Sequence, residues 1–325
     1  MKAIVQDRYG EPDDVLEFRE VDRPEPGERQ VLVRVHAAGV NIADWFIMTG
    51  IPYVIRLAGY GVRTPKRSVP GTDVAGVVEA VGAAVTRFKP GDEVFGEGTG
   101  TFAEYACADE DRLAAKPAGM TFEEAAGVPL AGVTAVMMLR DAGRLAAGQR
   151  LLVNGSSGGI GTYAVQIAKA MGAEVTAVCG PNNVDLVREL GADHVVDYSR
   201  EDFTRTDERY DAILDHVMNH PFSALLRLLT PTGVLMPNSG TGGKWLGGAR
   251  HRVKAEVIRP FTRRRLAPLL ARTTRADLEV LAGLAESGQL RTVVGRTWPL
   301  NDAARAVRHV GDGHARGKVV VTVQA

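Results

Sequence analysis

The sequence NGSSGGIG at residues 154–161 has the composition of a phosphate-binding turn. It follows the apolar run Leu151–Val153, which predicts a buried strand, and precedes apolar residues that recur at helical spacing. Glycines permit a tight turn and close backbone approach, and the amino end of a helix offers free N–H groups to a pyrophosphate. This order predicts a dinucleotide site, and the alternative is a glycine turn that only packs a helix on a sheet. The predicted cofactor contacts in this segment are Gly155, Ser156, Gly158, Gly159, Ile160 and Gly161.

The residues after the next expected strand bear on the choice between NADH and NADPH. About 20 positions beyond the glycines, an acidic residue usually binds the ribose 2′-hydroxyl of NAD. Here that place falls on residues 179–183 (CGPNN), which include no acid. A carboxylate would repel a 2′-phosphate, so its absence favours NADPH, with NADH as the weaker alternative. The residues predicted to contact this end of the cofactor are Cys179, Gly180, Asn183 and Tyr198.

These residues need a sheet to position them, and the chain beyond about residue 121 predicts one. β runs alternate with helical stretches there, which is typical of a parallel sheet with helices on both faces. The expected strands lie near residues 151–153, 175–178, 194–196, 212–215 and 234–236, with helices near 131–139, 160–171, 184–190 and 222–229. Ligands bind at the carboxyl ends of such strands, so Ser239 and Gly240, which follow the last run, are predicted cofactor contacts.

The first 120 residues or so have a different pattern. Short β segments such as Val31–Val35, Val74–Val81 and Phe102–Cys107 are separated by glycine and proline, which predicts an irregular, barrel-like domain. Residues 39–69 lack a clean period, as in a long functional or mobile loop. Beyond about residue 265 the pattern is mixed, and the final run 318–323 predicts a strand that could rejoin the amino-terminal domain.

Composition narrows the function classes. A length of 325 residues corresponds to about two domains. Lysine plus arginine equal aspartate plus glutamate at 39 each, so net charge gives no reason to expect nucleic acid or an anionic membrane as the main partner. Two cysteines form neither a disulfide framework nor a four-cysteine zinc lobe, and they fit a reduced compartment. The amino-terminal residues hold no signal-peptide core, and no run approaches the ~18 apolar residues of a membrane span, so we expect a cytoplasmic protein.

Several motifs in a fixed order resemble the medium-chain dehydrogenase/reductase superfamily, and the resemblance covers nearly the whole chain. They are residues 39–45 (GVNIADW), 70–78 (PGTDVAGVV), 89–94 (KPGDEV), 129–135 (PLAGVTA), 154–161, 190–193 (LGAD) and 317–320 (GKVV). The resemblance implies an α/β fold. In it, a Rossmann domain with a parallel sheet at residues 125–263 interrupts a discontinuous, mainly β, GroES-like catalytic domain at 1–124 and 264–325. It also implies an active site in the cleft between the domains and a homodimer.

The chain departs from the zinc-dependent alcohol dehydrogenases of this superfamily. These carry a catalytic Cys, a His-Glu pair and a second Cys at positions that read Asn41, Thr72-Asp73 and Leu130 here. A thiolate–imidazole zinc site cannot be built from these groups, so we expect no metal. The chain is therefore similar to the zinc-free quinone oxidoreductases and the enoyl or alkenal reductases.

That departure points to a reaction. Without a Lewis acid, the alkoxide of alcohol oxidation loses its main support, whereas reduction of an activated C=C or a quinone needs only hydrogen-bond donors. The expected activity is a zinc-independent, NADPH-dependent reduction of an enone, an enoyl thioester or a quinone by hydride transfer. The alternatives are a non-catalytic NADPH-binding sensor or structural protein, and an alcohol dehydrogenase.

The resemblance also assigns residues to the site. It places Asn41 beside the nicotinamide, where the amide could orient the ring or a substrate carbonyl, or could simply cap a loop. Tyr53 and Tyr60 fall in the loop that forms the substrate pocket of related reductases, where either could donate a proton or pack. Thr134 is expected at the nicotinamide half of the cofactor, and Lys318 at a cofactor phosphate or on the surface. Asp44 is expected to make a structural hydrogen bond.

One further segment is strongly basic. Residues 244–275 contain ten lysines and arginines against one acid, Glu256. Most such stretches are solvated helix faces. Two functional interpretations stay open, namely binding the phosphates of a CoA or carrier-protein thioester, and docking on an anionic membrane surface.

Overall fold

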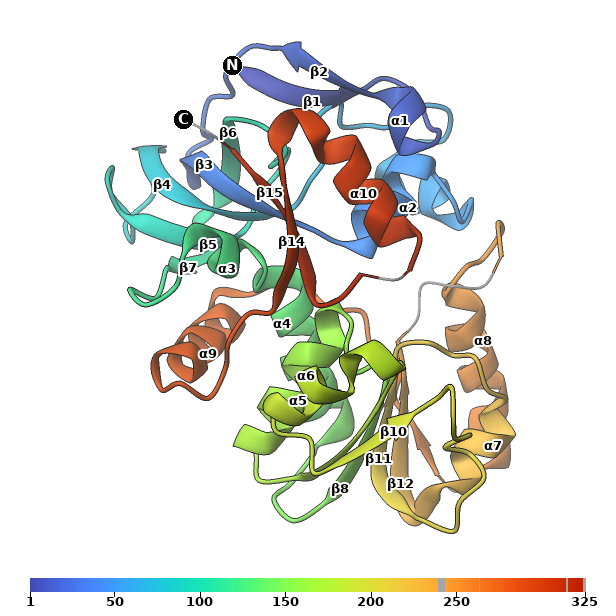
Figure 1. Ribbon diagram of the computed structural model, residues 1–325. Helices are drawn as coiled ribbons and strands as arrows, with labels where there is room; N and C mark the ends of the chain where they lie inside the picture. Colours follow the sequence, from blue (N-terminus) through green and yellow to red (C-terminus); the bar gives the residue numbers. More distant parts are fainter. Residues whose placement is uncertain (239–242, 263, 314, 324–325) are drawn as a thin grey trace. The chain divides into compact units, whose positions relative to one another are not determined.

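The computed structural model describes residues 1–238, 243–262, 264–313 and 315–323 (Figure 1). The chain divides into two compact units, one made of Met1–Val133 with Arg272–Ala325 and the other of Thr134–Ala271. These limits lie nine and eight residues beyond the predicted domain boundaries. The first division falls within helix α4 (Pro129–Val136).

The second unit is a parallel sheet with helices, as the alternating pattern predicted. Within the described residues the sheet has six strands in the order β10-β9-β8-β11-β12-β13, all pairs parallel. The strands are β8 (Arg150–Asn154), β9 (Glu174–Cys179), β10 (His194–Asp197), β11 (Tyr210–Asp215), β12 (Leu229–Pro237) and β13 (Arg265–Leu266). The helices are α5 (Gly159–Ala170), α6 (Val184–Glu189), α7 (Phe222–Arg227) and α8 (Ala249–Ile258).

The strand order reverses next to β8. From β8 the chain runs outward through β9 and β10, and it then returns to the other side of β8 for β11, β12 and β13. Leu151, Leu152 and Val153 of β8 have no exposed surface, as expected for a central strand covered on both faces. Such a reversal is the place where ligands bind in doubly wound sheets, outside the carboxyl ends of the strands.

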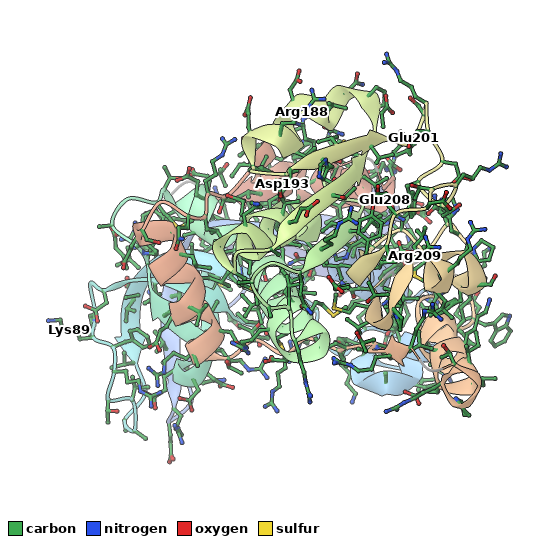
Figure 2. The ribbon with its side chains drawn as sticks, turned by 90° about the horizontal axis from the view of Figure 1, so that it is seen from below. Lys89, Arg188, Asp193, Glu201, Glu208 and Arg209 are labelled. Carbon is green, nitrogen blue, oxygen red and sulfur yellow. The ribbon has the colours of Figure 1, made fainter. Side chains whose placement is uncertain are left out.

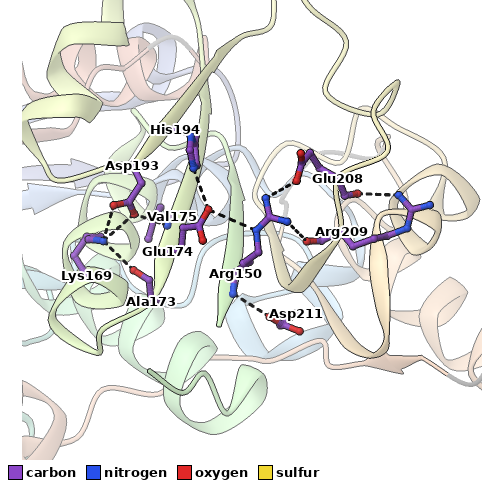
Figure 3. A network of polar contacts seen from close by, with 10 residues as sticks. All are labelled: Arg150, Lys169, Ala173, Glu174, Val175, Asp193, His194, Glu208, Arg209 and Asp211. Carbon is purple, nitrogen blue, oxygen red and sulfur yellow. Dashed lines mark hydrogen bonds and ion pairs between the residues drawn. The ribbon is translucent and has the colours of Figure 1, made fainter. Parts of the chain in front are cut away.

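The amino ends of the same strands are joined by charged side chains (Figure 3). Arg150 contacts Glu208 at 2.5 Å, Lys169 contacts Asp193 at 2.8 Å, and the backbone N–H of Arg150 donates to Asp211 at 3.0 Å. Seen from below, Asp193, Glu208 and Arg209 lie on this unit, as do the exposed Arg188 and Glu201 (Figure 2). Charged side chains at this edge of the sheet therefore pair mainly with one another.

The first unit is mainly β. Its larger sheet has the order β14-β15-β3-β4-β5-β7, with β6 paired to β3, which makes seven strands in the described part of the chain. The strands are β3 (Gln30–Val40), β4 (Asp73–Val81), β5 (Glu93–Glu97), β6 (Tyr105–Asp109), β7 (Leu113–Ala115), β14 (Val294–Pro299) and β15 (Lys318–Thr322). A separate hairpin consists of β1 (Lys2–Gln6) and β2 (Leu16–Glu20). The helices besides α4 are α1 (Pro12–Val15), α2 (Ile42–Thr49), α3 (Phe122–Ala126), α9 (Arg275–Glu286) and α10 (Ala303–Gly311).

The last strand returns to the amino-terminal part of the chain, as predicted. β15 pairs antiparallel with β3, in a register that sets Val319 opposite Val40. Lys318 is thereby brought to the end of β3, next to the turn that contains Asn41. The α/β fold with a parallel sheet and a mainly β second part, expected from the sequence, is confirmed. Within the described residues, no helix is long and apolar enough to cross a bilayer.

Candidate active site

The glycine turn lies between β8 and α5, and its shape requires glycine at two positions. Gly155 has a φ of +86°, in the left-handed region that disfavours side chains. A Cβ on Gly161 would come within 2.2 Å of the Gly155 carbonyl oxygen. The first turn of α5 therefore packs directly on the loop, as a close backbone approach to a ligand requires.

The amino end of α5 fits an anionic group. Its N-cap is Gly158, and no side chain caps the first turn, so the N–H groups at that end are open to a ligand. Gly159 and Ile160 lie in this first turn. Ser156 is placed differently, because its side chain is fully buried and its hydroxyl donates to the Val178 carbonyl oxygen at 2.9 Å. Ser156 thus holds the turn against β9, and its contact with the cofactor stays a prediction.

The end of β9 carries the residues predicted to select the cofactor. Cys179 is buried, and burial, reinforced by Asp197, raises the pKa of its thiol to about 11. A Cβ on Gly180 would lie 3.0 Å from the Tyr198 hydroxyl oxygen, so Tyr198, itself exposed, covers this glycine. Asn183 ends a short 3-10 turn (Pro181–Asn183) in front of α6.

One acidic residue near this end was missed in the sequence. Asp197 at the end of β10 lies opposite Cys179 in the sheet register. Hydrogen bonds from the hydroxyl and the N–H of Ser199 lower the pKa of the Asp197 carboxyl, which stays ionised. It could not be found by counting from the glycines, because it reaches this place by strand pairing. A carboxylate therefore stands beside a segment that itself has none.

Four more polar residues lie at the carboxyl ends of β8, β11 and β12. Asn154 donates through Nδ2 to Asp215 Oδ1 at 2.8 Å. His216 follows Asp215, and its Nδ1 is 3.3 Å from Nδ2 of Asn238. Asp215, His216 and Asn238 were not among the residues predicted from the sequence, although their position directly after strand runs was a usable signal.

The mainly β unit contains a buried polar cluster around Lys318. Its Nζ donates to Asn41 Oδ1 at 2.5 Å and lies 3.8 Å from Asp73 Oδ2. Asp73 also accepts the backbone N–H of Leu130 at 3.3 Å, and Asp44 accepts the backbone N–H of Asn41 at 2.8 Å. Lys318 is only 3% exposed and Asp73 has no exposed surface. The sequence suggested a cofactor phosphate or the surface for Lys318, and the surface alternative is wrong because β15 is paired on both sides.

Burial dominates the electrostatics of this cluster. It raises the pKa of Asp44 to about 7 and that of Asp73 to about 6, the latter against the opposing effect of Lys318 and of the Asn41 amide. Burial also lowers the pKa of Lys318, while Asp73 and Asp44 oppose that shift. The Asn41 amide therefore lies among the Lys318 ammonium and the carboxyl groups of Asp44 and Asp73, whose pKa values are raised to near neutral pH.

The orientation of the Asn41 amide is fixed by its partner. An ammonium only donates, so the oxygen of the amide must face Lys318. Its Nδ2 is buried and has no hydrogen-bond partner within the described ranges. The same amide lowers the pKa of the Asp73 carboxyl, so Asp73 is the nearby acceptor for its N–H groups in the absence of a ligand.

The same cluster does not fit a catalytic zinc ion. Such sites use thiolate, imidazole and carboxylate ligands around one open position. Here the groups are an amide, two carboxyls and the Lys318 ammonium, a cation that repels a metal ion. Over the part of the chain that the structure describes, no group of three or more His, Cys, Asp or Glu side chains could hold a metal.

Tyr53, the other predicted catalytic residue, lies against an arginine. The Arg56 guanidinium is 5.0 Å from the Tyr53 ring centroid and 4.4 Å from that of Tyr9, and Arg56 Nε donates to the Gly50 carbonyl. The hydroxyl of Tyr9 donates to the carbonyl of Tyr60, whose own side chain is exposed. The segment without a clean period includes helix α2, which the sequence analysis did not predict. Proton donation by Tyr53 stays a prediction.

The remaining predicted residues lie in α4 and, along the chain, after β12. Thr134 is buried in α4. Ser239 and Gly240 lie outside the described residues. The basic segment includes α8. Glu256 on this helix pairs at 3.3 Å with Arg259, which follows it, and the exposed Trp245 precedes it.

Known proteins resemble this chain over its whole length. A family model described as zinc-binding dehydrogenase matches residues 190–321, and one described as alcohol dehydrogenase GroES-like domain matches residues 27–118. The chloroplastic quinone-oxidoreductase QR1 of Triphysaria versicolor is 34% identical, over 99% of this chain and 98% of its own. A quinone oxidoreductase of Pseudomonas aeruginosa is 32% identical, over 98% of this chain and 99% of its own.

Solved structures agree with these relatives. The quinone oxidoreductase of Coxiella burnetii superposes with a TM-score of 0.87 at 30% identity, covering 100% of this chain and 99% of that one. The Escherichia coli quinone oxidoreductase, solved with NADPH, gives a TM-score of 0.82 at 25% identity, covering 99% and 100%.

Proposed function

The chain belongs to the quinone oxidoreductase branch of the medium-chain dehydrogenase/reductase superfamily, and from that premise we propose that it reduces a quinone or an activated C=C with NADPH, without zinc. NADH is the weaker alternative as cofactor. The preference for NADPH rests on the similar Escherichia coli enzyme, which was solved with NADPH, because Asp197 lies opposite Cys179 and the lack of an acid after β9 no longer supports it. The substrate class includes enones and enoyl thioesters. The observation that carries this proposal is the buried Asn41 amide, whose oxygen accepts from Lys318 and whose Nδ2 has no hydrogen-bond partner of normal geometry among the described residues.

The residues present suit both halves of such a reaction. When bound, NADPH supplies a hydride to an electron-poor carbon. The glycine turn and the uncapped amino end of α5 bind its pyrophosphate. The Asn41 amide donates a hydrogen bond to the oxygen on which negative charge develops, and in a buried setting such a donor is worth more than in water.

The surrounding charges set the orientation of that donor. Lys318 keeps the amide oxygen turned inward, and Asp73 holds the Lys318 ammonium in place. The Asp44 carboxyl fixes the backbone of Asn41 by accepting the Asn41 N–H group. Since a delocalised enolate or hydroquinone needs only hydrogen-bond donors, no Lewis acid is required.

The activity test is NADPH and NADH oxidation by purified, metal-analysed protein with quinones, enones and enoyl thioesters, with and without a chelator. We expect chelator-insensitive turnover that is faster with NADPH. Asn41→Ala should lower kcat by about 10²-fold, the effect of removing one such donor. The exposed Asn301 offers a matched control, and Asn301→Ala should leave kcat unchanged.

Three outcomes would contradict the proposal. Loss of activity with the chelator would restore a metal mechanism. An unchanged kcat in Asn41→Ala would remove the amide from the reaction. NADPH binding with no turnover on any substrate would favour the non-catalytic sensor or structural protein instead.

We also propose a homodimer in the cytoplasm, as the family resemblance implies. Light scattering on the purified protein should give twice the mass of one chain. A monomeric mass would contradict the dimer and leave the proposed reaction untouched.

A further inference from the structure

A groove with a volume of about 480 Å³ lies in the mainly β unit. Three arginines, a histidine, a tryptophan and two aspartates line it. Strand β14 and helix α10, which follow one another near the carboxyl end of the chain, supply most of these residues, and helix α1 supplies one (Figure 1). None of them belongs to the glycine turn or to the cluster around Lys318. A groove of this volume is large enough for a small molecule.

The sequence of α10 gives the helix two different faces. Ala306 and Val307 are buried in the core of the unit. Arg305, Arg308 and His309 are three and four positions apart, a spacing that places them on one face. All three line the groove. The apolar face therefore anchors the helix, while the other face presents its basic side chains to the groove.

Close packing fixes the place of this helix. A Cβ on Gly311 would lie 2.4 Å from Nε1 of Trp45, so the backbone of α10 lies directly on a side chain of α2. α10 also contacts α1 and β14, the other two elements of the groove. The groove is thus formed by packed elements, and a ligand would bind there with little rearrangement.

Arg296 on β14 is a cation of this groove without an acidic partner. It lies two positions from Trp298 and therefore on the same face of the strand. Its guanidinium carbon is 4.4 Å from the Trp298 ring centroid, and the His309 ring centroid is 5.3 Å from that of Trp298. Among the residues that the structure describes, no carboxylate pairs with Arg296. A guanidinium stacked on a ring keeps its N–H groups at the edge, where they match the oxygens of a phosphate or a carboxylate.

The other two arginines have acidic partners that an anion can displace. Arg308 forms an ion pair with Asp13 of α1, and Arg305 lies 3.7 Å from Asp302. All four side chains are substantially exposed, and exposed pairs contribute little to stability. The lining has three arginines against two aspartates, so it carries a positive charge before His309 is counted.

We propose that this groove binds a small phosphorylated molecule. Its phosphate group lies on the Arg296 guanidinium, and Arg308 joins it when Asp13 is displaced. A phosphate carries a charge of about −1.5 to −2 at pH 7 and three acceptor oxygens, which suit two guanidinium groups better than one. This site goes beyond the proposed function and does not depend on it, because the two share no residue.

The test is binding of inorganic phosphate, measured by calorimetry with NADPH at saturation so that the glycine turn is occupied. We expect saturable binding by the wild type. Arg296→Gln should raise the dissociation constant at least about 10-fold, the effect of one hydrogen bond between charged groups. Arg296→Lys, which keeps the charge without the planar fork, should recover part of the loss.

A second variant predicts a change in the opposite direction. Asp13→Asn removes the internal partner of Arg308, so the dissociation constant for phosphate should fall by about threefold, the strength of one exposed ion pair. A merely structural role of these residues would not tighten binding. The control is Arg209→Gln, at an exposed arginine of the parallel-sheet unit, which should leave the constant unchanged (Figure 3). Melting temperatures of all variants show whether they fold.

The possible results separate this inference from the proposed function. A wild type that shows no saturable phosphate binding would overturn the site, and so would unchanged dissociation constants in both Arg296→Gln and Asp13→Asn. Tighter binding of malonate, a dicarboxylate, than of phosphate would overturn the class of ligand. A protein whose phosphate binding depends on Arg296 but that oxidises no NADPH with any substrate would remove the proposed function and support this inference.

Discussion

Lys318 is the residue on which the buried cluster depends, because it supplies the cation between two carboxyl groups. Its ammonium contacts the Asn41 amide and lies near Asp73, in a region with almost no solvent. Charges in such a place are costly to bury and are tolerated only when paired. Removing one member of the cluster therefore leaves its partners buried without a counter-charge, which lowers the free energy of unfolding more than removing an exposed charge does.

We expect Lys318→Met to lower the free energy of unfolding by about 3 kcal/mol at pH 7, because it leaves Asp73 buried without its cation. Urea unfolding measures this. Lys89→Met, at an exposed lysine labelled in Figure 2, should change it by less than about 0.5 kcal/mol. Adding Asp73→Asn to Lys318→Met should recover part of the loss. A double variant as unstable as the sum of the single ones would show that the two groups are not coupled.

Asp44 makes a prediction about pH. Its pKa is raised to about 7 in the folded state, from an ordinary value of 3.8, so its ionised form favours unfolding. The cost is absent below about pH 4, grows as pH rises through the folded pKa, and is complete above it. Asp44→Asn should therefore gain stability relative to the wild type between pH 4 and pH 7, by about 1 kcal/mol or more at the upper end. Urea unfolding at pH 4 and pH 8 measures the difference, and a gain of equal size at both values would contradict it.

At the scale of elements, the strand–glycine–helix unit could be predicted because its signals are local. Residues 154–161 carry the turn, and α5 begins at Gly159, one residue before the predicted start. Helix α2 was missed because its eight residues do not show the alternation of apolar and polar positions that marks an amphipathic helix. Its start depends on Asp44, which accepts the N–H of Asn41.

The glycine turn allows a matched pair of substitutions. Gly161→Ala places a Cβ 2.2 Å from the Gly155 carbonyl oxygen, so the turn must open and the affinity for NADPH should fall at least about 10-fold. Gly283→Ala lies in α9, where nothing would lie within 4 Å of the new methyl group. It should leave the affinity unchanged and stabilise the helix by up to about 1 kcal/mol. Fluorescence titration with NADPH and thermal melting measure the two effects, and equal affinities in both variants would argue against a role of the turn in binding.

The polar cluster shows what local signals cannot supply. Asn41 and Lys318 are 277 residues apart, and only the pairing of β15 with β3 brings them together. The sequence suggested a role for each residue separately, with Lys318 at a cofactor phosphate or on the surface. Likewise, Asp197 reaches the end of β9 through strand register. Residues on one continuous motif can be predicted together, whereas those joined by sheet pairing require the topology.

At the scale of the whole molecule, the two units differ in continuity. The parallel-sheet unit is one uninterrupted segment, Thr134–Ala271, while the other is made of two segments. A continuous segment with its own core can fold alone. The buried residues around Phe203, Phe222 and Leu235 form such a core within this unit.

We expect residues 129–271, which keep α4 whole, to fold when expressed alone and to bind 2′,5′-ADP within about threefold of the affinity of the full chain. Circular dichroism and calorimetry test this. A fragment that stays unfolded would show that the sheet needs the other unit for its stability.

The pairing of β15 with β3 also orders events during synthesis. β3 leaves the ribosome early, but the strand that completes its sheet on that side is made only after the entire parallel-sheet unit. Until then residues 37–40 of β3, which β6 does not cover, offer unpaired backbone groups, which are a template for association with other chains. The nascent protein therefore passes through an interval in which the parallel-sheet unit can be finished while the mainly β unit still lacks its last strand.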